Sequence, residues 1–276
     1  MRAAVVGHLE WVQFVRVPAV PLSGDIVHAL EWWDEPAGGG PAAAVQLHKL
    51  GAQTSFFTAL GDDELGRRAL ADLERRGLDV HAVFRNEPTR RAVCFVDGAG
   101  ERTITVMGER LAPRRTDELD WDLLSTIDAL YFTAGDAAAL RESRRARVLT
   151  ATARALEVLR QERIELDALV GSLVDPGEKF SPDELHKPPR LSIWTDGERG
   201  GKYAIDKGAG AYPPFPVSAD EVVDRYGAGD AFAAALTFAL GAGMTTSEAL
   251  QLAARAGAAA VRGRGPYEGQ LLLSDL

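Results

Sequence analysis

The sequence predicts an α/β protein of three layers, in which helices cover both faces of a central, mostly parallel sheet and a small β-sheet forms a lid. Short apolar segments that suit buried strands alternate with helical segments along most of the chain, an order typical of parallel sheets. One β-rich insert, residues 82–107, interrupts this alternation. The length of 276 residues suffices for one large α/β domain, so we expect a single domain over residues 1–276.

The first eighty residues begin with an apolar strand that ends at Gly7. Partial alternation then predicts two extended segments. A flexible glycine-rich loop, Pro36–Pro41, precedes a helix that Gly51 ends. The acidic residues Asp62–Glu64 suit the dipole at the start of a later helix better than a metal site. The segments expected here are Ala3–Val6 (strand), Trp11–Val17 and Ile26–Trp33 (extended), Ala42–Leu50 (helix), Thr54–Leu60 (strand) and Arg67–Gly77 (helix).

The insert is predicted to form a small separate sheet. His81–Phe84, Arg91–Val96 and Arg102–Val106 have β-like patterns, and Asp97–Gly100 suits a hairpin turn. Together with the extended segments before Pro36, the insert is expected to cover a site. We therefore place the lid at about residues 11–35 and 82–107, and its edge strands give a reason to expect a homodimer that pairs through the lid.

Strand and helix alternate again in the second half of the chain. A helical turn with proline at its first position, Ser181–Leu185, is expected between two of the strands. The expected strands are Ala129–Thr133, Val148–Thr152, Ala168–Leu173, Leu191–Thr195, Lys202–Ile205 and Gly210–Phe215. The expected helices are Ala137–Arg147, Arg154–Arg163, Ala231–Gly243 and Ser247–Val261.

The segment Asp224–Phe232, DRYGAGDAF, has the strongest chemical character in the chain. An apolar run with helical character follows it, so the Gly-Ala-Gly step should lie at a helix N-terminus, where exposed N–H groups and the helix dipole bind an anion. A carboxylate at Asp230 would take a proton from an attacking hydroxyl while the N–H groups hold developing negative charge. The alternative is structural: Asp230 caps the helix and the glycines form a turn.

Two other glycine-rich turns support the first interpretation. The loop at Gly38 precedes a helix, and another turn begins at Asp196. Each of the three turns follows a candidate strand, and ligands on parallel sheets bind beyond the carboxyl ends of the strands. We therefore expect all three on the same rim of the sheet, although the Gly38 loop taken alone would serve equally as a plain connector.

Composition limits the class of partner. The net charge of −9 argues against a nucleic-acid partner, and no run approaches the roughly 18 apolar residues that span a membrane. The single cysteine, Cys94, excludes an internal disulfide and fits a cytoplasmic location. The five histidines have no metal-ligand spacing.

The chain resembles the PfkB-type carbohydrate kinases of the ribokinase-like superfamily along nearly its full length. The family's C-terminal signature matches Asp224, Gly227–Asp230 and Phe232, and its N-terminal signature matches Gly38–Gly40 with Leu50-Gly51. The turn after Thr195 resembles its T-x-G-x-x-G motif, and Asp175 with Glu178 resembles its N-x-x-E motif.

This resemblance implies a ribokinase-like fold and transfer of the ATP γ-phosphate to a hydroxyl of a sugar, sugar derivative or nucleoside. Asp230 would be the general base, and the N–H groups of Gly227, Ala228 and Gly229 would form the anion hole. Glu178 would act on Mg²⁺ through water. The resemblance also places the nucleotide at Asp175, Thr195, Asp196, Gly197, Glu198, Arg199, Gly200, Ala254 and Gly257. It places a potassium ion on backbone oxygens near Asp224, Tyr226, Ala260, Gly263 and Gly265.

The departures from the family pattern concern the acceptor. The family's Asn after the glycine loop is replaced by Ala42 or Ala43, and Val12 stands near the place of a sugar-binding Asp. Glu10, Trp11 and Asp25 are therefore expected to form a different substrate pocket together with Gly38, Gly39 and Gly40.

Two further departures lie beside the phosphate groups. Arg225-Tyr226 replaces a small Thr pair, and Arg225 either reaches a phosphate or is a solvated side chain. Asp175 replaces Asn and changes the charge next to Mg²⁺. The main hypothesis is an ATP-dependent kinase; the alternative is a ligand-binding or regulatory protein that has lost turnover, and a nucleotide hydrolase is disfavoured because a lid excludes water.

Overall fold

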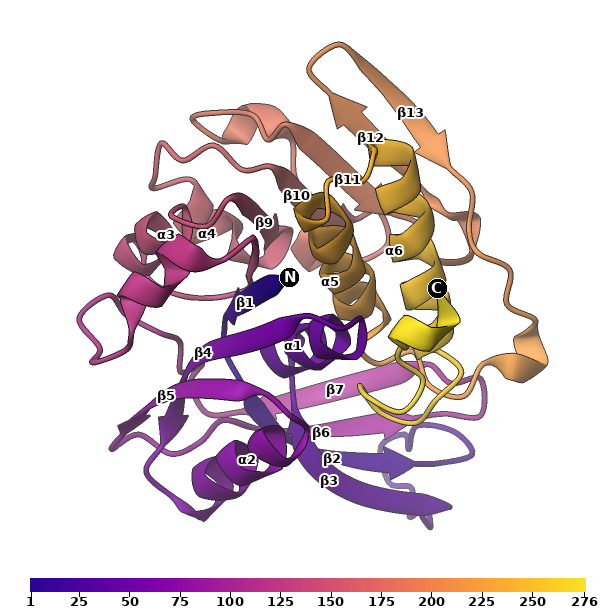
Figure 1. The fold of residues 1–276 in the computed structure, drawn as a ribbon. Coiled ribbons are helices and arrows are strands. Elements are labelled where there is room, and N and C mark those ends of the chain that lie inside the picture. The colour runs from indigo at the N-terminus through magenta and orange to yellow at the C-terminus, as the bar shows by residue number, and fades with distance from the viewer.

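The computed structural model describes residues 1–276, and its centre is a nine-stranded sheet in the order β13-β12-β11-β10-β9-β8-β1-β4-β5 (Figure 1). The strands from β11 to β5 in that order run parallel, whereas β12 and β13 are antiparallel additions at one edge. The strands are β1 (Arg2–Val6), β4 (Gln53–Gly61), β5 (Asp79–Arg85), β8 (Ala129–Phe132), β9 (Val148–Thr152), β10 (Ala168–Ser172), β11 (Leu191–Thr195), β12 (Gly201–Ile205) and β13 (Gly208–Tyr212).

Helices cover both faces of this sheet, as the sequence predicts. β1 shows why: alternate side chains point to opposite faces, so Ala3 and Val5 join one core while Ala4 and Val6 join the other. The first core contains residues of α1 (Gly39–Lys49), α2 (Glu64–Arg75), α5 (Ala228–Gly241) and α6 (Thr246–Ala260). The second contains residues of α3 (Ala137–Ser143), α4 (Leu156–Leu159) and the 3-10 segment Trp121–Thr126.

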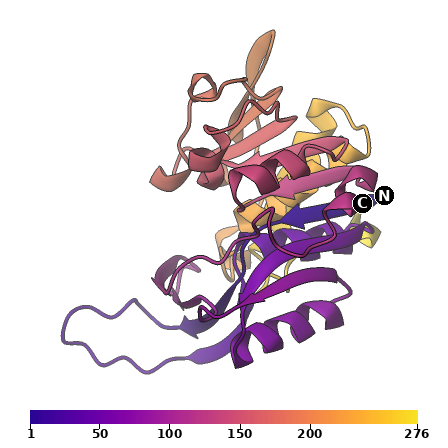
Figure 2. The same cartoon turned by 90° about the vertical axis from the view of Figure 1, so that its left-hand side faces the viewer.

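A separate four-stranded sheet, which we call the lid sheet, has the order β3-β2-β6-β7. Its strands are β2 (Glu10–Arg16), β3 (Glu31–Ala37), β6 (Arg91–Val96) and β7 (Arg102–Met107). Phe14 and Val12 pack with Ala92, Cys94 and Tyr226 in a small core of their own. The loop between β2 and β3 extends beyond the body of the molecule (Figure 2).

The structure corrects three predicted boundaries. The segment 79–85 is β5, which pairs in parallel with β4 at the edge of the main sheet, so the lid insert begins after it. Pro36 and Ala37 belong to β3 rather than to a flexible loop, because they pair with Trp11 and Glu10 of β2. The expected helix 154–163 shrinks to a 3-10 turn and the four residues of α4. No helix is long and apolar enough to cross a membrane.

Candidate active site

A cavity of about 410 Å³ lies between the carboxyl ends of the central strands and the lid sheet. Such strand ends are where ligands bind in parallel α/β sheets. The lid sheet contributes Ile104 and Val106 from β7. The main sheet contributes Tyr131, Thr133, Thr152, Val170 and Thr195, which lie at or just beyond the ends of β8, β9, β10 and β11.

Asp230 faces this cavity from the first turn of α5. The helix begins after Gly227, whose φ of 78° is the left-handed conformation that glycine adopts without strain. No side chain caps the helix, and no hydrogen bond of the structure involves the Asp230 carboxylate, so the capping interpretation is wrong. The N–H groups of Gly227, Ala228 and Gly229 are likewise not used in the loop hydrogen bonds.

The surroundings of Asp230 favour its protonated form. Burial and, after it, the negative charge of Glu178 raise the pKa of this carboxyl to about 6, against the opposing effect of Arg154. A carboxyl group with a pKa near neutrality can both accept and release a proton at physiological pH.

The three glycines at the start of α1 have three different roles. Gly38 has a φ of 95°, and its N–H donates to the Tyr226 hydroxyl at 3.0 Å. A Cβ atom at Gly39 would lie 2.8 Å from Asp230 Oδ1, so only glycine lets the carboxylate approach. A Cβ atom at Gly40 would lie 2.5 Å from the carbonyl oxygen of His8, so this glycine serves packing. The glycine loop thus shapes the cavity wall beside Asp230.

The turn after β11 brings Thr195 to the cavity and leaves its neighbours on the surface. Asp196 pairs with Arg199 at 2.6 Å. Glu198 pairs with Arg225 at 2.7 Å, so Arg225 links this turn to the loop before Gly227. Gly197 and Gly200 have positive φ, which the tight turn requires. Ala254 and Gly257 lie on α6 outside the cavity lining; a Cβ atom at Gly257 would be 3.3 Å from the Ala228 carbonyl oxygen.

Arg154, which the sequence analysis did not identify, holds the two carboxylates of the N-x-x-E-like segment. Its Nε lies 2.7 Å from Glu178 Oε1, and its Nη2 pairs with Asp175. Burial raises the pKa of Glu178, although Arg154 opposes that shift. A Cβ atom at Gly171 would lie 2.4 Å from the Glu178 carbonyl oxygen, so glycine at the end of β10 lets this segment pack over the strand.

Among the expected acceptor residues, Glu10 lines the cavity and Asp25 does not. Glu10 Oε2 lies 3.2 Å from Arg90 Nε, and both side chains are buried. Asp25 lies in the exposed β2–β3 loop, where its carboxylate accepts the Leu22 N–H at 3.0 Å. Trp11 donates to Asp34 instead of facing the cavity. The predicted grouping of Glu10, Trp11 and Asp25 is therefore wrong.

Asp224 is fully buried beside the segment that follows α6. Its carboxylate accepts the N–H groups of Tyr226 at 2.8 Å and Gly265 at 3.0 Å. No basic side chain forms an ion pair with it, and burial raises its pKa despite these two hydrogen bonds. Ala260 and Gly263 stand on the same C-terminal segment as Gly265. A buried carboxylate without a cationic partner has the chemistry that a bound cation would satisfy.

Residues at all three glycine-rich turns line one cavity, as expected, but not because each turn follows a strand of the main sheet. Only the turn at Asp196 follows a strand of the main sheet. The turn at Gly38 follows β3 of the lid sheet, and Gly227 follows a loop. Thr195, Gly38 and Gly227 nevertheless line one cavity.

Several cavity residues carried no motif in the sequence. They are polar or basic and lie next to strand ends: His8, Arg90, Arg102, Arg110, Thr133 and Arg154. The signal that could have found Thr133 and Arg154 is their position one and two residues beyond the ends of β8 and β9. Ala42 and Ala43, in contrast, are fully buried in the core and contribute nothing to the cavity.

A parallel α/β fold with a polar cavity at its strand ends is typical of proteins that bind small molecules. The model of the pfkB family carbohydrate kinases matches residues 2–161 and 146–271. The chain therefore belongs to this family of ATP-dependent sugar kinases.

Individual relatives agree with this assignment. The chain is similar to fructokinase-1 of Zea mays, with 29% identity over 238 residues that cover 72% of each protein. It is also similar to the ribokinase of Bacillus subtilis (strain 168), with 26% identity over 96% of this chain and 94% of that protein.

Solved structures share the ribokinase fold. A putative ribokinase from Agrobacterium tumefaciens superposes with a TM-score of 0.81 at 21% identity, covering 99% of this chain and 95% of the other. The Arabidopsis thaliana ribokinase complexed with ribose and ATP superposes with a TM-score of 0.76 at 21% identity, covering 99% and 96%.

Proposed function

We propose that this kinase transfers the γ-phosphate of ATP to a hydroxyl of a sugar, sugar derivative or nucleoside, with Asp230 as the general base. The observation that carries the proposal is the Asp230 carboxylate, which faces the cavity without a hydrogen bond and stands beside free N–H groups at the start of α5. A carboxylate in this position is available to a substrate hydroxyl.

The reaction would proceed by in-line transfer. Asp230 takes the proton of the acceptor hydroxyl, and the acceptor oxygen forms a bond to the γ-phosphorus while the bond to the β–γ bridging oxygen of ATP breaks. The N–H groups of Gly227, Ala228 and Gly229, together with the dipole of α5, stabilise the negative charge that develops. Glu178 and Arg154 form an ion pair that lines the same cavity as Asp230. Phosphoryl transfer depends on positioning and charge, which these groups supply.

The nucleotide would lie along the turn after β11 and the second half of α6. Thr195 lines the cavity, and Gly197 and Gly200 let the turn approach a ligand closely. Ala254 and Gly257 are small residues of α6, and Gly257 lies close to Ala228 of α5. Asp175, Asp196, Glu198 and Arg199 complete the proposed nucleotide site. The Arabidopsis ribokinase, which has the same fold, binds ATP in its complex.

Mg²⁺ fits the residues at Glu178. This ion keeps several waters and binds chiefly to nucleotide phosphates with one or two carboxylates, and three acidic, cysteine or histidine side chains are not grouped anywhere in the chain. Glu178 would hold it through water, with Asp175 kept in place by Arg154. When bound, the ion neutralises charge on the transferred phosphate. The buried charge of Asp224 likewise fits K⁺ on the backbone oxygens of the segment near Gly265.

The lid sheet would close over the acceptor and exclude water. Ile104 and Val106 of β7 already line the cavity. Every residue of β7 is exposed, and this strand is an edge of the lid sheet, so a homodimer that pairs through the lid is proposed with it. Slower hydrogen exchange in β7 when acceptor and nucleotide bind would support closure, whereas unchanged exchange would contradict it.

The test is ATP consumption with a panel of sugars, sugar derivatives and nucleosides, measured for the wild type and Asp230→Asn. We expect turnover with at least one acceptor and a loss of about 10²- to 10⁴-fold in kcat for the variant, with ATP affinity nearly unchanged. Undiminished turnover in Asp230→Asn would remove Asp230 from the role of base. Acceptor binding by the wild type without any turnover would instead favour a ligand-binding protein that has lost activity.

A further inference from the structure

The acceptor end of the cavity, which we define as His8, Glu10, Arg90 and Arg110, carries more positive charge than a neutral sugar needs. His8 and Glu10 lie between β1 and β2, Arg90 precedes β6, and Arg110 follows β7. Gly108 packs against Arg90, since a Cβ atom there would lie 3.9 Å from the Arg90 Cα. The ends of β6 and β7 thus bring the two arginines to one end of the cavity.

The charges of the cavity do not balance at this end. Arg154 pairs with both Glu178 and Asp175, and Arg90 pairs with Glu10. Arg102 lies at the opposite end of β7 and donates to the Arg225 carbonyl oxygen at 3.3 Å. Arg110 is an exposed residue that lines the cavity, and its side chain forms neither an ion pair nor a hydrogen bond. One cation without a partner therefore remains at the acceptor end, in a chain whose net charge is −9.

Unpartnered polar atoms mark the same end as a binding surface. His8 is 8% exposed, and its Nδ1 atom has no hydrogen-bond partner. Thr133 Oγ1, which lines the same cavity, is also buried without one. Buried polar groups are nearly always paired in folded proteins, so a group of unpaired atoms around a cavity indicates a missing ligand. Burial and the nearby Arg110 lower the pKa of His8 to about 3, so its ring is neutral and offers hydrogen bonds rather than charge.

We infer that the phosphoryl acceptor is an acidic sugar, whose carboxylate binds to Arg110 with help from Arg90 and His8. This inference rests on the proposed kinase function and specifies its acceptor. The single unpaired guanidinium matches a single negative charge, and a charge-assisted hydrogen bond from arginine suits the planar carboxylate. A neutral sugar would leave Arg110 next to Arg90 without compensation.

The experiment compares aldonic, 2-ketoaldonic and uronic acids with neutral sugars of the same carbon skeleton and with the corresponding sugar 6-phosphates. Wild type, Arg110→Met, Arg110→Lys and Arg114→Met are assayed with ATP and Mg²⁺. Arg114 is the matched control, because it is exposed, lies outside the cavity lining and its side chain forms no ion pair. Thermal unfolding of each variant checks that it is folded.

We expect an acid to give a higher kcat/KM than its neutral counterpart, and we expect Arg110→Met to reduce this ratio by about 10- to 100-fold. Arg110→Lys should retain part of the preference, and Arg114→Met should retain all of it. A higher salt concentration should raise KM for the acid more than for the neutral sugar. Equal or better turnover of neutral sugars would overturn the inference and leave the kinase proposal intact, and a preference for sugar phosphates would overturn the carboxylate assignment.

Binding measurements separate the two proposals where turnover is not seen. Calorimetry with a non-hydrolysable ATP analogue and Mg²⁺ would be run with the same acids. Binding of an acid to the wild type, weakened in Arg110→Met and without turnover, would support the acidic ligand while the kinase proposal fails. Binding of neutral sugars with no binding of any acid would overturn the inference.

Discussion

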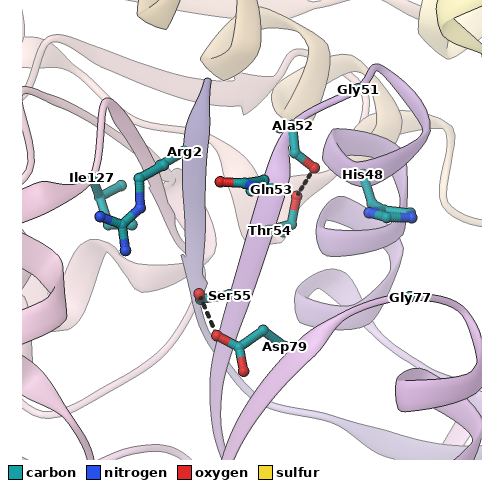
Figure 3. A pocket seen from close by; sticks show the side chains of 10 residues that line it. All are labelled: Arg2, His48, Gly51, Ala52, Gln53, Thr54, Ser55, Gly77, Asp79 and Ile127. Atoms are coloured by element: carbon teal, nitrogen blue, oxygen red, sulfur yellow. Dashed lines mark hydrogen bonds between the residues drawn. The ribbon is translucent and has the colours of Figure 1, made fainter.

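Two cavities lie at opposite edges of the main parallel sheet, and the one of greater volume is not the candidate active site. A cavity of about 510 Å³ lies at the amino ends of β1, β4 and β5, and the cavity of about 410 Å³ lies beyond β1 and along β8, β9, β10 and β11 toward their carboxyl ends. The residues of the larger one are shown in Figure 3: Arg2, His48, Gly51, Ala52, Gln53, Thr54, Ser55, Gly77, Asp79 and Ile127.

The two cavities differ in how their polar groups are satisfied. In the larger one, Ser55 donates to Asp79 at 2.9 Å and Thr54 donates to the Ala52 carbonyl oxygen at 3.2 Å, with His48 Nδ1 as the exception (Figure 3). In the smaller one, Asp230 has no hydrogen-bond partner. Volume therefore does not identify the site, whereas unpaired buried polarity does.

The pKa of Asp79 in the larger cavity and the pKa of Asp230 in the smaller one are shifted in opposite directions. Burial raises the pKa of Asp79, but hydrogen bonds from His81 and Ser55 outweigh it and the net pKa is lowered. Burial and the charge of Glu178 raise the pKa of Asp230 to about 6. The difference follows from the fold, because the carboxyl ends of parallel strands face helix N-termini and loops whose N–H groups remain free for a ligand.

The largest effect that would sharpen this contrast is expected from Arg154→Met. Removing the guanidinium leaves Glu178 and Asp175 without their partner beside Asp230, so kcat should fall by about 10²- to 10³-fold. Arg154 also lowers the pKa of Asp230, so its loss should move the acid limb of the rate profile upward from about pH 6. The measurement is kcat/KM from pH 5 to 9.

Arg154→Lys serves as the control, since it keeps the positive charge but loses the guanidinium that contacts both Glu178 and Asp175. We expect a smaller shift of the acid limb for this variant than for Arg154→Met. An acid limb that stays in the same place in both variants would show that Arg154 does not act on the ionisation of Asp230.

The next effect concerns stability, and Asp230→Asn should make the unliganded protein more stable at pH 8. The folded-state pKa of Asp230 is raised from 3.8 to about 6, so folding favours the protonated form. The folded protein loses stability as pH rises from about 4 through 6, and the full loss is about 3 kcal/mol. The neutral amide avoids this loss.

Chemical unfolding at pH 8 and at pH 4 measures this prediction. The stabilisation by Asp230→Asn should be present at pH 8 and shrink toward zero at pH 4, where the wild-type carboxyl is protonated. An equal effect at both pH values would mean that packing, and not the buried charge, governs this position.

The sequence predicted those parts of the site that depend on backbone conformation. Glycine at position 227 could be inferred from the sequence because the motif packs two glycines directly before a helical segment, and Gly227 there adopts the left-handed conformation that glycine tolerates. Gly39 also depends on backbone conformation, since the Asp230 carboxylate approaches it too closely for a side chain. The alternation of strands and helices predicted the main sheet, because burial on both faces requires continuous apolar segments.

The remaining features depend on tertiary placement, which local patterns do not encode. The segment at 79–85 was assigned to the lid because its β-like composition does not show which sheet it joins, and only its parallel pairing with β4 places it at the edge of the main sheet. Arg90 and Arg110 are far apart in the chain from Arg154 and lie in no motif, and only the folded lid brings them to one cavity. Asp25 was misplaced because it lies in the exposed loop between β2 and β3 and does not line the cavity.

The smallest effect on turnover and stability is expected from substitutions in the larger cavity. These substitutions test directly whether the two cavities differ in function. Asp79→Asn should leave turnover within about twofold and lower stability by at most about 1 kcal/mol, since an exposed carboxylate gains little from its hydrogen bonds. Ser55→Ala removes the same hydrogen bond from the other side and should behave alike. Steady-state turnover and chemical unfolding measure both effects. A loss of turnover by 10-fold or more in either variant, with the fold intact, would mean that the amino ends of the strands contribute to catalysis, and the distinction between paired and unpaired cavities would fail.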